Sequence, residues 1–382
     1  MKVLVTGIGL TSALGNLYQS WEKILQGKSA IRLHRPFAEL PLLPLALINS
    51  GPIELPWLIR QVVGTTVKSS GLTVPLPECG VVIGSSRGYQ GMLEVWAKKH
   101  FFQDCKQDDL EKDYGSFLNL LPHQPAIFAA SQIGARGTVL APMAACATGI
   151  WAIARGFELI KTGQCQRVIV GAVESPITPL SIGGFKKMGA LARTGAYPFD
   201  RYREGLVLGE GAAILVLESP ELARQRRAKI FGQIRGFALT NDASYGTKPE
   251  VSGKGARLAI AQCLARSGLA PEDIDYIHAH GTATELNDRY EANLIQEVFP
   301  LKVAVSSTKG ATGHTLGASG ALGAVFCLMA IAHQVLPPCV GLNDPEFDLD
   351  LVRCARRSRV DNILCLSFGF GGQNAALVLS KV

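Results

Sequence analysis

Cys146 has surroundings that suit a reactive side chain. It lies among small residues at 144–149, directly before a segment, 150–157, in which apolar residues recur at helical spacing. The short apolar run 138–141 before it predicts a buried strand. At a turn from strand to helix, free N–H groups and the positive end of the helix dipole favour a thiolate nucleophile. The alternative is that Cys146 is a small buried hydrophobe, as many free cysteines are.

Two histidines, a lysine and a glycine-rich turn could act together with this cysteine. They are His280, Lys309, His314 and the turn at 369–372. Each has a purely structural alternative, since a histidine at a strand end can be a satisfied polar residue and a glycine turn can be only a turn. All of them lie at the ends of predicted strands, however, and open α/β sheets bind their ligands at strand ends. The pattern therefore predicts one site assembled from distant segments.

The elements that must position these groups are strands alternating with helices, which indicates mostly parallel sheets covered by helices. Buried strands are expected at 3–9, 80–86, 167–172, 211–218, 274–281, 303–307 and 364–372, and a half-exposed strand at 229–235. Helices are expected at 256–267 and after the segment 313–320, the second one ending near His333. The first strand is expected to end in a glycine turn at Gly7 and Gly9. The proline-rich residues 30–80 are expected to form a covering loop region, and the charged residues 98–113 an exposed helical insertion.

The second part of the chain repeats the first in outline. Cys146 and His314 each stand before a helix, at comparable places in the two parts. This internal similarity predicts two related halves, residues 1–225 with Cys146 and residues 226–382 with His280 and His314.

The composition limits the class of protein. Of 382 residues, 47% are hydrophobic and 18% charged, as expected for a globular protein with a large core. The net charge of +7 comes without a basic run interleaved with aromatic residues, which argues against nucleic acid and favours an acidic partner. Nine scattered cysteines without a C-x-x-C pair argue against a zinc site or a disulfide framework. They indicate a reducing compartment.

We expect a cytoplasmic protein that is not bound to membranes. The N-terminus lacks the charged and apolar regions of a signal peptide. The longest uncharged apolar run, 316–332, is glycine-rich and short for a membrane span.

Over roughly residues 138–382 the chain resembles the β-ketoacyl-acyl carrier protein synthases, the Cys-His-His condensing enzymes of the thiolase-like superfamily. The matching segments occur in the family's order. They are ACATG at 145–149, PFD at 198–200 with REG at 203–205, GEGA at 209–212, HGTAT at 280–284 with Asp288 and Glu291, Lys309 with TGH at 312–314, and SFGFGG at 367–372. The resemblance implies a five-layered αβαβα fold made of two similar halves.

The resemblance also implies a reaction, the decarboxylative Claisen condensation of fatty acid or polyketide synthesis. Cys146 would hold the acyl group as a thioester, with the backbone N–H groups of Cys146 and Phe370 as the oxyanion hole. His280 and His314 would stabilise the enolate that forms when a malonyl thioester loses carbon dioxide. Lys309 and Glu291 would form a buried ion pair that holds the histidines.

Substrate contacts and partners follow from the same resemblance. Thr282 and Thr284 would bind the phosphopantetheine arm of an acyl carrier protein, and Phe368 and Phe370 would contact the substrate, Phe370 as the gate of the acyl pocket. The implied enzyme is a homodimer that uses no metal and no cofactor beyond the carrier's phosphopantetheine.

The chain also departs from the family in ways that bear on the substrate. Segments 30–80, 89–137, 183–198 and 239–253 are shorter or different, which leaves the chain-length preference open. Arg60 and Lys68 could meet an acidic carrier protein or simply be solvated.

Three other functions compete with the condensing enzyme. A thiolase would need a second reactive cysteine in a C-x-G-G-G turn, and Cys365 is followed by a different sequence. A non-condensing partner subunit of a heterodimeric ketosynthase would lack the nucleophile, which is present. A nucleotide-binding protein would carry a third glycine where Ser12 stands.

Overall fold

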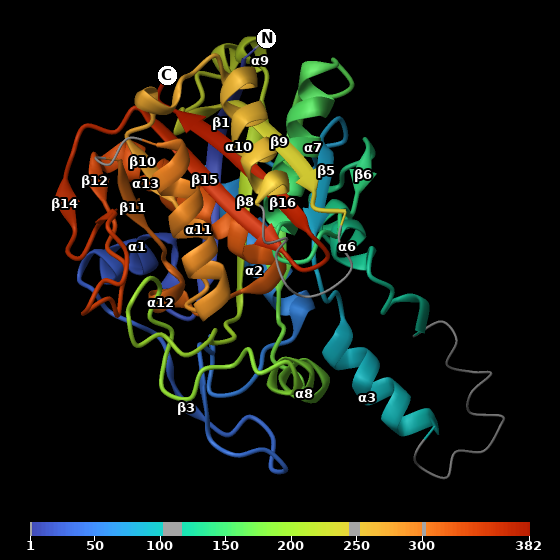
Figure 1. Cartoon of the computed structure of the whole chain (residues 1–382). Helices are drawn as coiled ribbons and strands as arrows, with labels where there is room; N and C mark the ends of the chain where they lie inside the picture. Colours follow the sequence, from blue (N-terminus) through green and yellow to red (C-terminus); the bar gives the residue numbers. More distant parts are fainter. Residues whose placement is uncertain (1, 102–116, 244–252, 300–302) are drawn as a thin grey trace.

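A large sheet crosses the centre of the molecule, with helices on its faces and the two termini at the same end (Figure 1). The computed structural model describes residues 2–101, 117–243, 253–299 and 303–382. The strands are β1 (Val3–Ser12), β2 (Gly15–Asn16), β3 (Arg32–His34), β4 (Leu43–Leu45), β5 (Gly80–Gly84), β6 (Val139–Leu140), β7 (Arg167–Glu174), β8 (Gly211–Glu218), β9 (Gly232–Asn241), β10 (Tyr276–His278), β11 (Ala304–Ser306), β12 (Val335–Leu336), β13 (Asp350–Leu351), β14 (Arg356–Arg357), β15 (Asn362–Gly369) and β16 (Gln373–Ser380).

The helices lie between these strands along the chain. They are α1 (Leu17–Leu25), α2 (Leu55–Ser69), α3 (Gln90–Phe101), α6 (Gln124–Ile133), α7 (Thr148–Lys161), α8 (Pro179–Lys187), α9 (Pro220–Gln225), α10 (Lys254–Ser267), α11 (Glu285–Val298), α12 (Lys309–Thr312) and α13 (Ser319–His333), with 3₁₀ turns η1 (Pro271–Asp273) and η2 (Leu316–Ala318).

The strands form one hydrogen-bonded path, β13-β11-β10-β15-β16-β9-β1-β8-β7-β5-β6, with β2 on β1 and the pairs β12–β14 and β3–β4 apart from it. Pairing of β1 with β9 joins the strands of the two parts of the chain. The expectation of mostly parallel sheets is wrong. The long pairs β1–β8, β7–β8, β9–β16 and β15–β16 are antiparallel. Antiparallel neighbours need no helical crossover, and a tight glycine turn joins β15 to β16.

Two helices, α7 and α13, pack against each other in the middle of the molecule. α7 lies on β5 and β7, whereas α13 lies on β8, β15 and β16. On the outer faces, α2 covers β1 and β8, α6 covers β5, and α10 covers β9 and β16. The single path of strands thus provides two layers with α7 and α13 between them, and this order of helix, strand layer, helix, strand layer and helix confirms the predicted fold class. The division at residues 225 and 226 falls just after α9 and stays a prediction.

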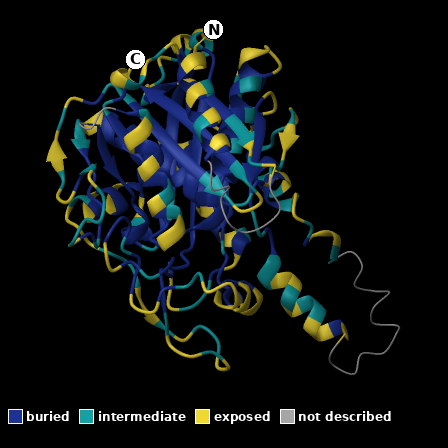
Figure 2. Cartoon of the chain, in the orientation of Figure 1, coloured by how far each residue is buried: buried dark blue, intermediate teal, exposed yellow. Residues whose placement is uncertain are grey.

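The stretch Leu316–His333, made of η2 and α13, is apolar and long enough to cross a membrane, but 89% of it is buried inside the protein. Its apolar character therefore reflects its place between sheet layers, in the dark-blue interior of Figure 2.

Several local expectations need correction. Residues 30–80 contain α2, a 15-residue helix whose buried face includes Leu58 and Val62, rather than only covering loops. Pro56 does not prevent this helix because it stands in the first turn, where a proline N–H is not needed. The strand predicted at 138–141 forms as β6, but Val139 and Leu140 are exposed because β6 lies at the end of the sheet path. The helix predicted at 98–113 begins earlier, as α3, and most of that range lies outside the described residues.

The first strand does not end at its glycines. β1 continues through Gly7 and Gly9 to Ser12, with an irregularity in its register after Val5. The glycines are required by the helix that lies on this strand: a Cβ at Gly9 would come within 1.9 Å of the Thr66 hydroxyl oxygen on α2. These glycines therefore allow α2 to lie close to β1, and they do not form a turn.

This contact predicts the effect of an added methyl group. Gly9→Ala must push α2 away from β1, and overpacking of this kind costs about 1–3 kcal/mol. The matched control is Gly64→Ala on α2, where the nearest atom to a new Cβ is the Gln132 amide nitrogen at 3.4 Å. There the better helix propensity of alanine should stabilise the protein by up to about 1 kcal/mol. Urea unfolding of both variants measures the difference, and equal midpoints would contradict this account of β1.

Candidate active site

Cys146 lies in the turn between β6 and α7, and local hydrogen bonds fix its position. The Thr148 hydroxyl donates to the Ala145 carbonyl at 2.7 Å and accepts from the Ala144 N–H at 2.8 Å. Ala145 adopts a φ of 47°, a conformation that is unusual outside glycine. The Ser367 hydroxyl on β15 donates to the Cys146 carbonyl at 2.8 Å. The nucleophile candidate is thus held by both parts of the chain.

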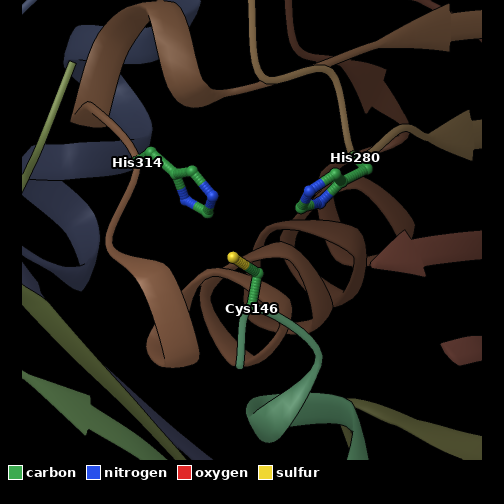
Figure 3. A group of neighbouring side chains, drawn as sticks. All are labelled: Cys146, His280 and His314. Atoms are coloured by element: carbon green, nitrogen blue, oxygen red, sulfur yellow. The ribbon is translucent and has the colours of Figure 1, made fainter. Parts of the chain in front are cut away.

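The two predicted histidines converge on this sulfur. Figure 3 shows the Cys146 sulfur pointing into the space between the His280 and His314 rings. The ligand atoms of the three side chains all lie within 4.8 Å of one another. The ring centroids of the histidines are 5.5 Å apart at an interplanar angle of 82°. Residues far apart in the sequence therefore form one compact group, as the sequence predicts.

Lys309 and Glu291 both act on His280, but not as the direct ion pair that the resemblance implies. The Glu291 carboxylate accepts the backbone N–H groups of His280 at 2.6 Å and Gly281 at 2.7 Å. The Lys309 ammonium donates to the His280 carbonyl and lies 3.4 Å from Nδ1 of the same ring. An ammonium group can only donate, so Nδ1 accepts and the ring proton is on Nε2. Lys309 thereby selects the tautomer of His280.

His314 is held from its own side. Its N–H donates to the Val207 carbonyl at 2.6 Å, and its carbonyl accepts the Gly209 N–H at 3.1 Å. Nδ1 lies 2.9 Å from the Ser319 hydroxyl in the first turn of α13. A hydroxyl can donate or accept, so Ser319 supports either tautomer of His314.

Burial decides the protonation states of these groups. It lowers the pKa of His280 and of His314 well below the ordinary value, and the positive charge of Lys309 lowers both further. Burial also lowers the pKa of Lys309 and raises that of Glu291, while the opposite charge of each counteracts the shift of the other. Both imidazoles are therefore neutral near pH 7.

The predicted thiolate is not favoured. Burial raises the pKa of Cys146 to about 11, although the charges of Lys309 and Arg87 lower it. Only 7% of Cys146 is exposed, so the cost of removing a thiolate from water exceeds the stabilisation from the helix end. The resting nucleophile is a thiol.

The group opens into a cavity of about 370 Å³. The predicted substrate residues Thr282, Thr284, Phe368 and Phe370 line it together with Cys146, His280 and His314. The two threonine hydroxyls lie 2.9 Å apart. Phe370 is 37% exposed, and its ring centroid is 6.1 Å from that of Phe185. Lys309 and Glu291 do not line the cavity, so the structure separates groups that can touch a substrate from groups that position them.

The predicted oxyanion hole brings two backbone segments together. A Cβ at Gly369 would lie 3.1 Å from the Cys146 nitrogen and 2.9 Å from the Ala144 carbonyl oxygen. The missing side chain lets the turn that carries Phe370 approach the Cys146 N–H. Two N–H groups at such a place could hold a developing oxyanion.

A cysteine and two histidines are also metal ligands, so a metal site was a possible alternative. The Lys309 ammonium contacts the ring of His280 and would repel a divalent cation there. Lys309 therefore opposes a metal function for this group.

Two supporting residues were not identified from the sequence. Glu174 is fully buried, and its carboxylate accepts from the loop after β5, including the Ser86 N–H at 2.5 Å. Ser319 contacts His314 as described above. The detectable signal for Glu174 is a lone acidic residue at the end of an otherwise apolar strand, in the segment 168–174.

Cys365, the cysteine considered for a thiolase, is fully buried on β15. It does not line the cavity, and its sulfur lies 3.9 Å from Nδ1 of His278. The described residues thus place only one cysteine at the site.

Comparisons with known proteins agree with this geometry. The model of the β-ketoacyl synthase N-terminal domain matches residues 58–223, and that of the C-terminal domain matches residues 231–343. The 3-oxoacyl-[acyl-carrier-protein] synthase 2 of Coxiella burnetii is 34% identical, over 100% of this chain and 99% of its own. The synthase of the same name from Synechocystis sp. is 35% identical, over 100% and 98%.

Solved structures show the same fold. A ketosynthase described as bound to a hexaketide, in complex with a type II polyketide acyl-carrier protein, superposes with a TM-score of 0.92 at 28% identity, covering 100% of this chain and 99% of that one. A β-ketoacyl synthase from Burkholderia phymatum gives a TM-score of 0.88 at 26% identity, with the same coverage.

The lowered histidine pKa values predict a pH dependence. In the unfolded chain, histidines bind protons below about pH 6.5, whereas His280 and His314 stay neutral in the folded protein. The free energy of unfolding is therefore highest above about pH 6.5 and decreases as the pH falls below that value. NMR titration of ¹³C-labelled histidines, assigned with single His→Gln variants, measures both pKa values directly. Lys309→Met should raise the pKa of His280 by removing the neighbouring charge. A midpoint at or above 6.5 for either ring in the unmodified protein would contradict the account.

Proposed function

We propose that this chain, which belongs to the β-ketoacyl synthase family, condenses an acyl group held on Cys146 with a malonyl group delivered by an acyl carrier protein. The observation that carries the proposal is the convergence of Cys146, His280 and His314 in one cavity. The product is a β-ketoacyl thioester two carbons longer than the acyl donor.

In the first step, the Cys146 sulfur attacks the acyl thioester and the carrier's thiol leaves. The thiol proton must be removed as the C–S bond forms, because the resting pKa of Cys146 is about 11. Nε2 of His314 takes this proton and then transfers it to the departing thiol of the carrier. This role requires the ring proton to be on Nδ1, where it can be donated to the Ser319 hydroxyl. The N–H groups of Cys146 and Phe370 hold the oxyanion of the tetrahedral intermediate.

In the second step, the malonyl group loses carbon dioxide and the electrons of the broken C–C bond form an enolate. Nε2–H of His280, fixed by Lys309, donates to the enolate oxygen. His314 donates as well after its ring proton has moved from Nδ1 to Nε2 by exchange with water, and the Ser319 hydroxyl then donates to Nδ1. The enolate carbon attacks the acyl carbonyl on Cys146, the C–S bond breaks, and the thiolate takes a proton from water. Neutral imidazoles suit this role because they donate without giving up a proton to the enolate.

The carrier protein and its phosphopantetheine are the proposed delivery system. Thr282 and Thr284 lie on the cavity wall, where their hydroxyls can hydrogen-bond the amides of the arm. The net charge of +7 suits an acidic carrier, and Arg60 and Lys68 are exposed on α2. A related ketosynthase is described in complex with its acyl-carrier protein. We place this reaction in the cytoplasm, without a metal or a further cofactor.

Two variants separate the two steps. Cys146→Ala should abolish condensation but retain decarboxylation of malonyl carrier protein, since the histidines remain. His314→Ala should lower the rate of decarboxylation by about a hundredfold or more, because one hydrogen-bond donor to the enolate is missing. Product mass spectrometry and carbon dioxide release measure the two rates.

Cys354→Ala is the matched control, because Cys354 is exposed and does not line the cavity. It should condense at the rate of the unmodified protein. A Cys146→Ala protein that condenses at a normal rate would remove the nucleophile from this mechanism, and unchanged carbon dioxide release by His314→Ala would remove that histidine.

A homodimer is proposed from the edge of the sheet. β6 is one of the two end strands of the path, and an exposed edge strand is a template for pairing with another chain. Val139 and Leu140 on β6 are each 37% exposed, and Met143, three residues before Cys146, is 54% exposed. A second copy covering this edge would bury these side chains and stiffen the segment that carries the nucleophile.

Val139→Lys should therefore give a monomer of 40.8 kDa where the unmodified protein gives twice that mass. Light scattering after size exclusion measures both species. Leu258→Lys, at a 49% exposed leucine on α10, is the control and should stay dimeric. A monomeric unmodified protein, or a dimeric Val139→Lys variant, would rule out pairing through β6.

A further inference from the structure

Arg87 is a cation beside the active site that the reaction described above does not use. It stands in the loop between β5 and α3, and the buried Glu174 carboxylate fixes this loop. Glu174 accepts from the Ser85 hydroxyl, from the Ser86 N–H at 2.5 Å and from the Arg87 N–H at 3.2 Å. The Ser86 hydroxyl in turn accepts the Gly317 N–H at 3.3 Å, next to the His314 segment. The backbone of Arg87 is therefore held at a fixed place relative to the catalytic groups.

The side chain of Arg87 reaches the apolar surroundings of Cys146. Its guanidinium carbon lies 5.6 Å from the ring centroid of Phe185. Phe185 lines the cavity and belongs to the apolar cluster that encloses Cys146. Other members of this cluster are Ile177, Ile182, Leu206, Leu208 and Leu316. Arg87 itself is not among the residues that line the cavity, so an acyl chain on Cys146 reaches the guanidinium only by passing Phe185.

The guanidinium lacks a polar partner within the described residues. Its Nε is shielded from solvent and donates no hydrogen bond, and none of the described carboxylates forms an ion pair with it. Glu174 meets Arg87 only through the backbone N–H. Arg87 as a whole is only partly buried, so its charge keeps some contact with water, whereas the shielded Nε is a donor without an acceptor. Leaving such a donor unused costs free energy unless a ligand supplies the acceptor. The stacking on Phe185 compensates the charge only in part.

We infer that Arg87 determines acyl specificity, by donating hydrogen bonds to an oxygen carried along the acyl chain on Cys146. The preferred substrates are then acyl groups with a carbonyl or carboxylate oxygen beyond the thioester, rather than saturated chains. This inference rests on the proposed function and names its substrate class. A saturated chain at this place would bury the guanidinium without giving it an acceptor.

A purely electrostatic role makes a different prediction. The charge of Arg87 also lowers the pKa of the Cys146 thiol. That effect changes attack on every acyl donor equally, so it cannot alter the ratio of rates between an oxygenated and a saturated donor. The ratio is therefore the quantity to measure.

The experiment compares three pantetheine thioesters, octanoyl, 7-oxooctanoyl and 7-carboxyheptanoyl, together with their six- and ten-carbon homologues. Intact-mass measurement gives the rate of Cys146 acylation in a single turnover, and kcat/KM is measured for condensation with malonyl carrier protein. The unmodified protein should react faster with an oxygenated donor than with the octanoyl donor. Comparison of the 7-oxooctanoyl and 7-carboxyheptanoyl donors shows whether a ketone or a carboxylate oxygen is preferred. Arg87→Met should reduce the preference by about 10- to 100-fold, the usual effect of losing a hydrogen bond to a charged group.

Arg87→Lys should restore part of the preference, because it keeps a cationic donor. Arg155→Met is the matched control, since Arg155 lies 5.3 Å from the Trp151 ring centroid on the far part of α7 and should leave the ratio unchanged. An unchanged ratio in Arg87→Met, or a preference of the unmodified protein for octanoyl, would overturn the inference alone. Failure of every donor to acylate Cys146 would overturn the proposed function as well.

Discussion

The site depends on the close contact between the first turns of α7 and α13. A Cβ at Gly149 would come within 2.4 Å of the Ala321 nitrogen, and one at Gly320 within 3.2 Å of the Ile150 nitrogen. Cys146 directly precedes α7 and His314 shortly precedes α13, so this helix packing sets the distance between sulfur and imidazole. A packed interior deforms little, which makes the catalytic geometry a property of the core rather than of mobile loops.

Charges buried around this contact are held mainly by the backbone. Glu291 accepts two backbone N–H groups beside His280, and Lys309 donates to a backbone carbonyl of the same residue. Glu174 holds the loop after β5 in the same way. A buried charged side chain that hydrogen-bonds to the main chain fixes the position of that backbone. Removing the side chain would leave buried backbone N–H or C=O groups unpaired.

The two parts of the chain contribute differently to the site. The second part supplies the histidines and the groups that set their protonation, which serve the enolate in any condensation. The first part supplies the nucleophile and most of the cluster around it, including Phe185 and the neighbouring Arg87. The two sets of contacts meet at one segment, since Val207 and Gly209, whose backbone holds His314, flank Leu208 of that cluster.

The sequence alone determined the chemistry. The residue types at 146, 280, 309 and 314 predicted one site assembled from distant segments, and the motifs around them indicated the reaction through their resemblance to the β-ketoacyl synthases. Most strands were also predicted correctly, since short continuous apolar runs bounded by glycines are typical of buried strands. The prolines of 30–80 hid α2, because a proline in the first turn of a helix cannot be told from a loop signal.

Only the tertiary structure decided the protonation states and the supporting contacts. The pKa of Cys146 depends on desolvation by segments distant in sequence, so the helix-end argument gave the wrong direction. Lys309 and Glu291 were expected to pair, but each finds a nearer partner on His280. Glu174 and Arg87 were missed because the loop after β5 and the end of β7 are far apart in sequence and adjacent only in the sheet. Burial and long-range contact are properties of the packed chain, and no local pattern encodes them.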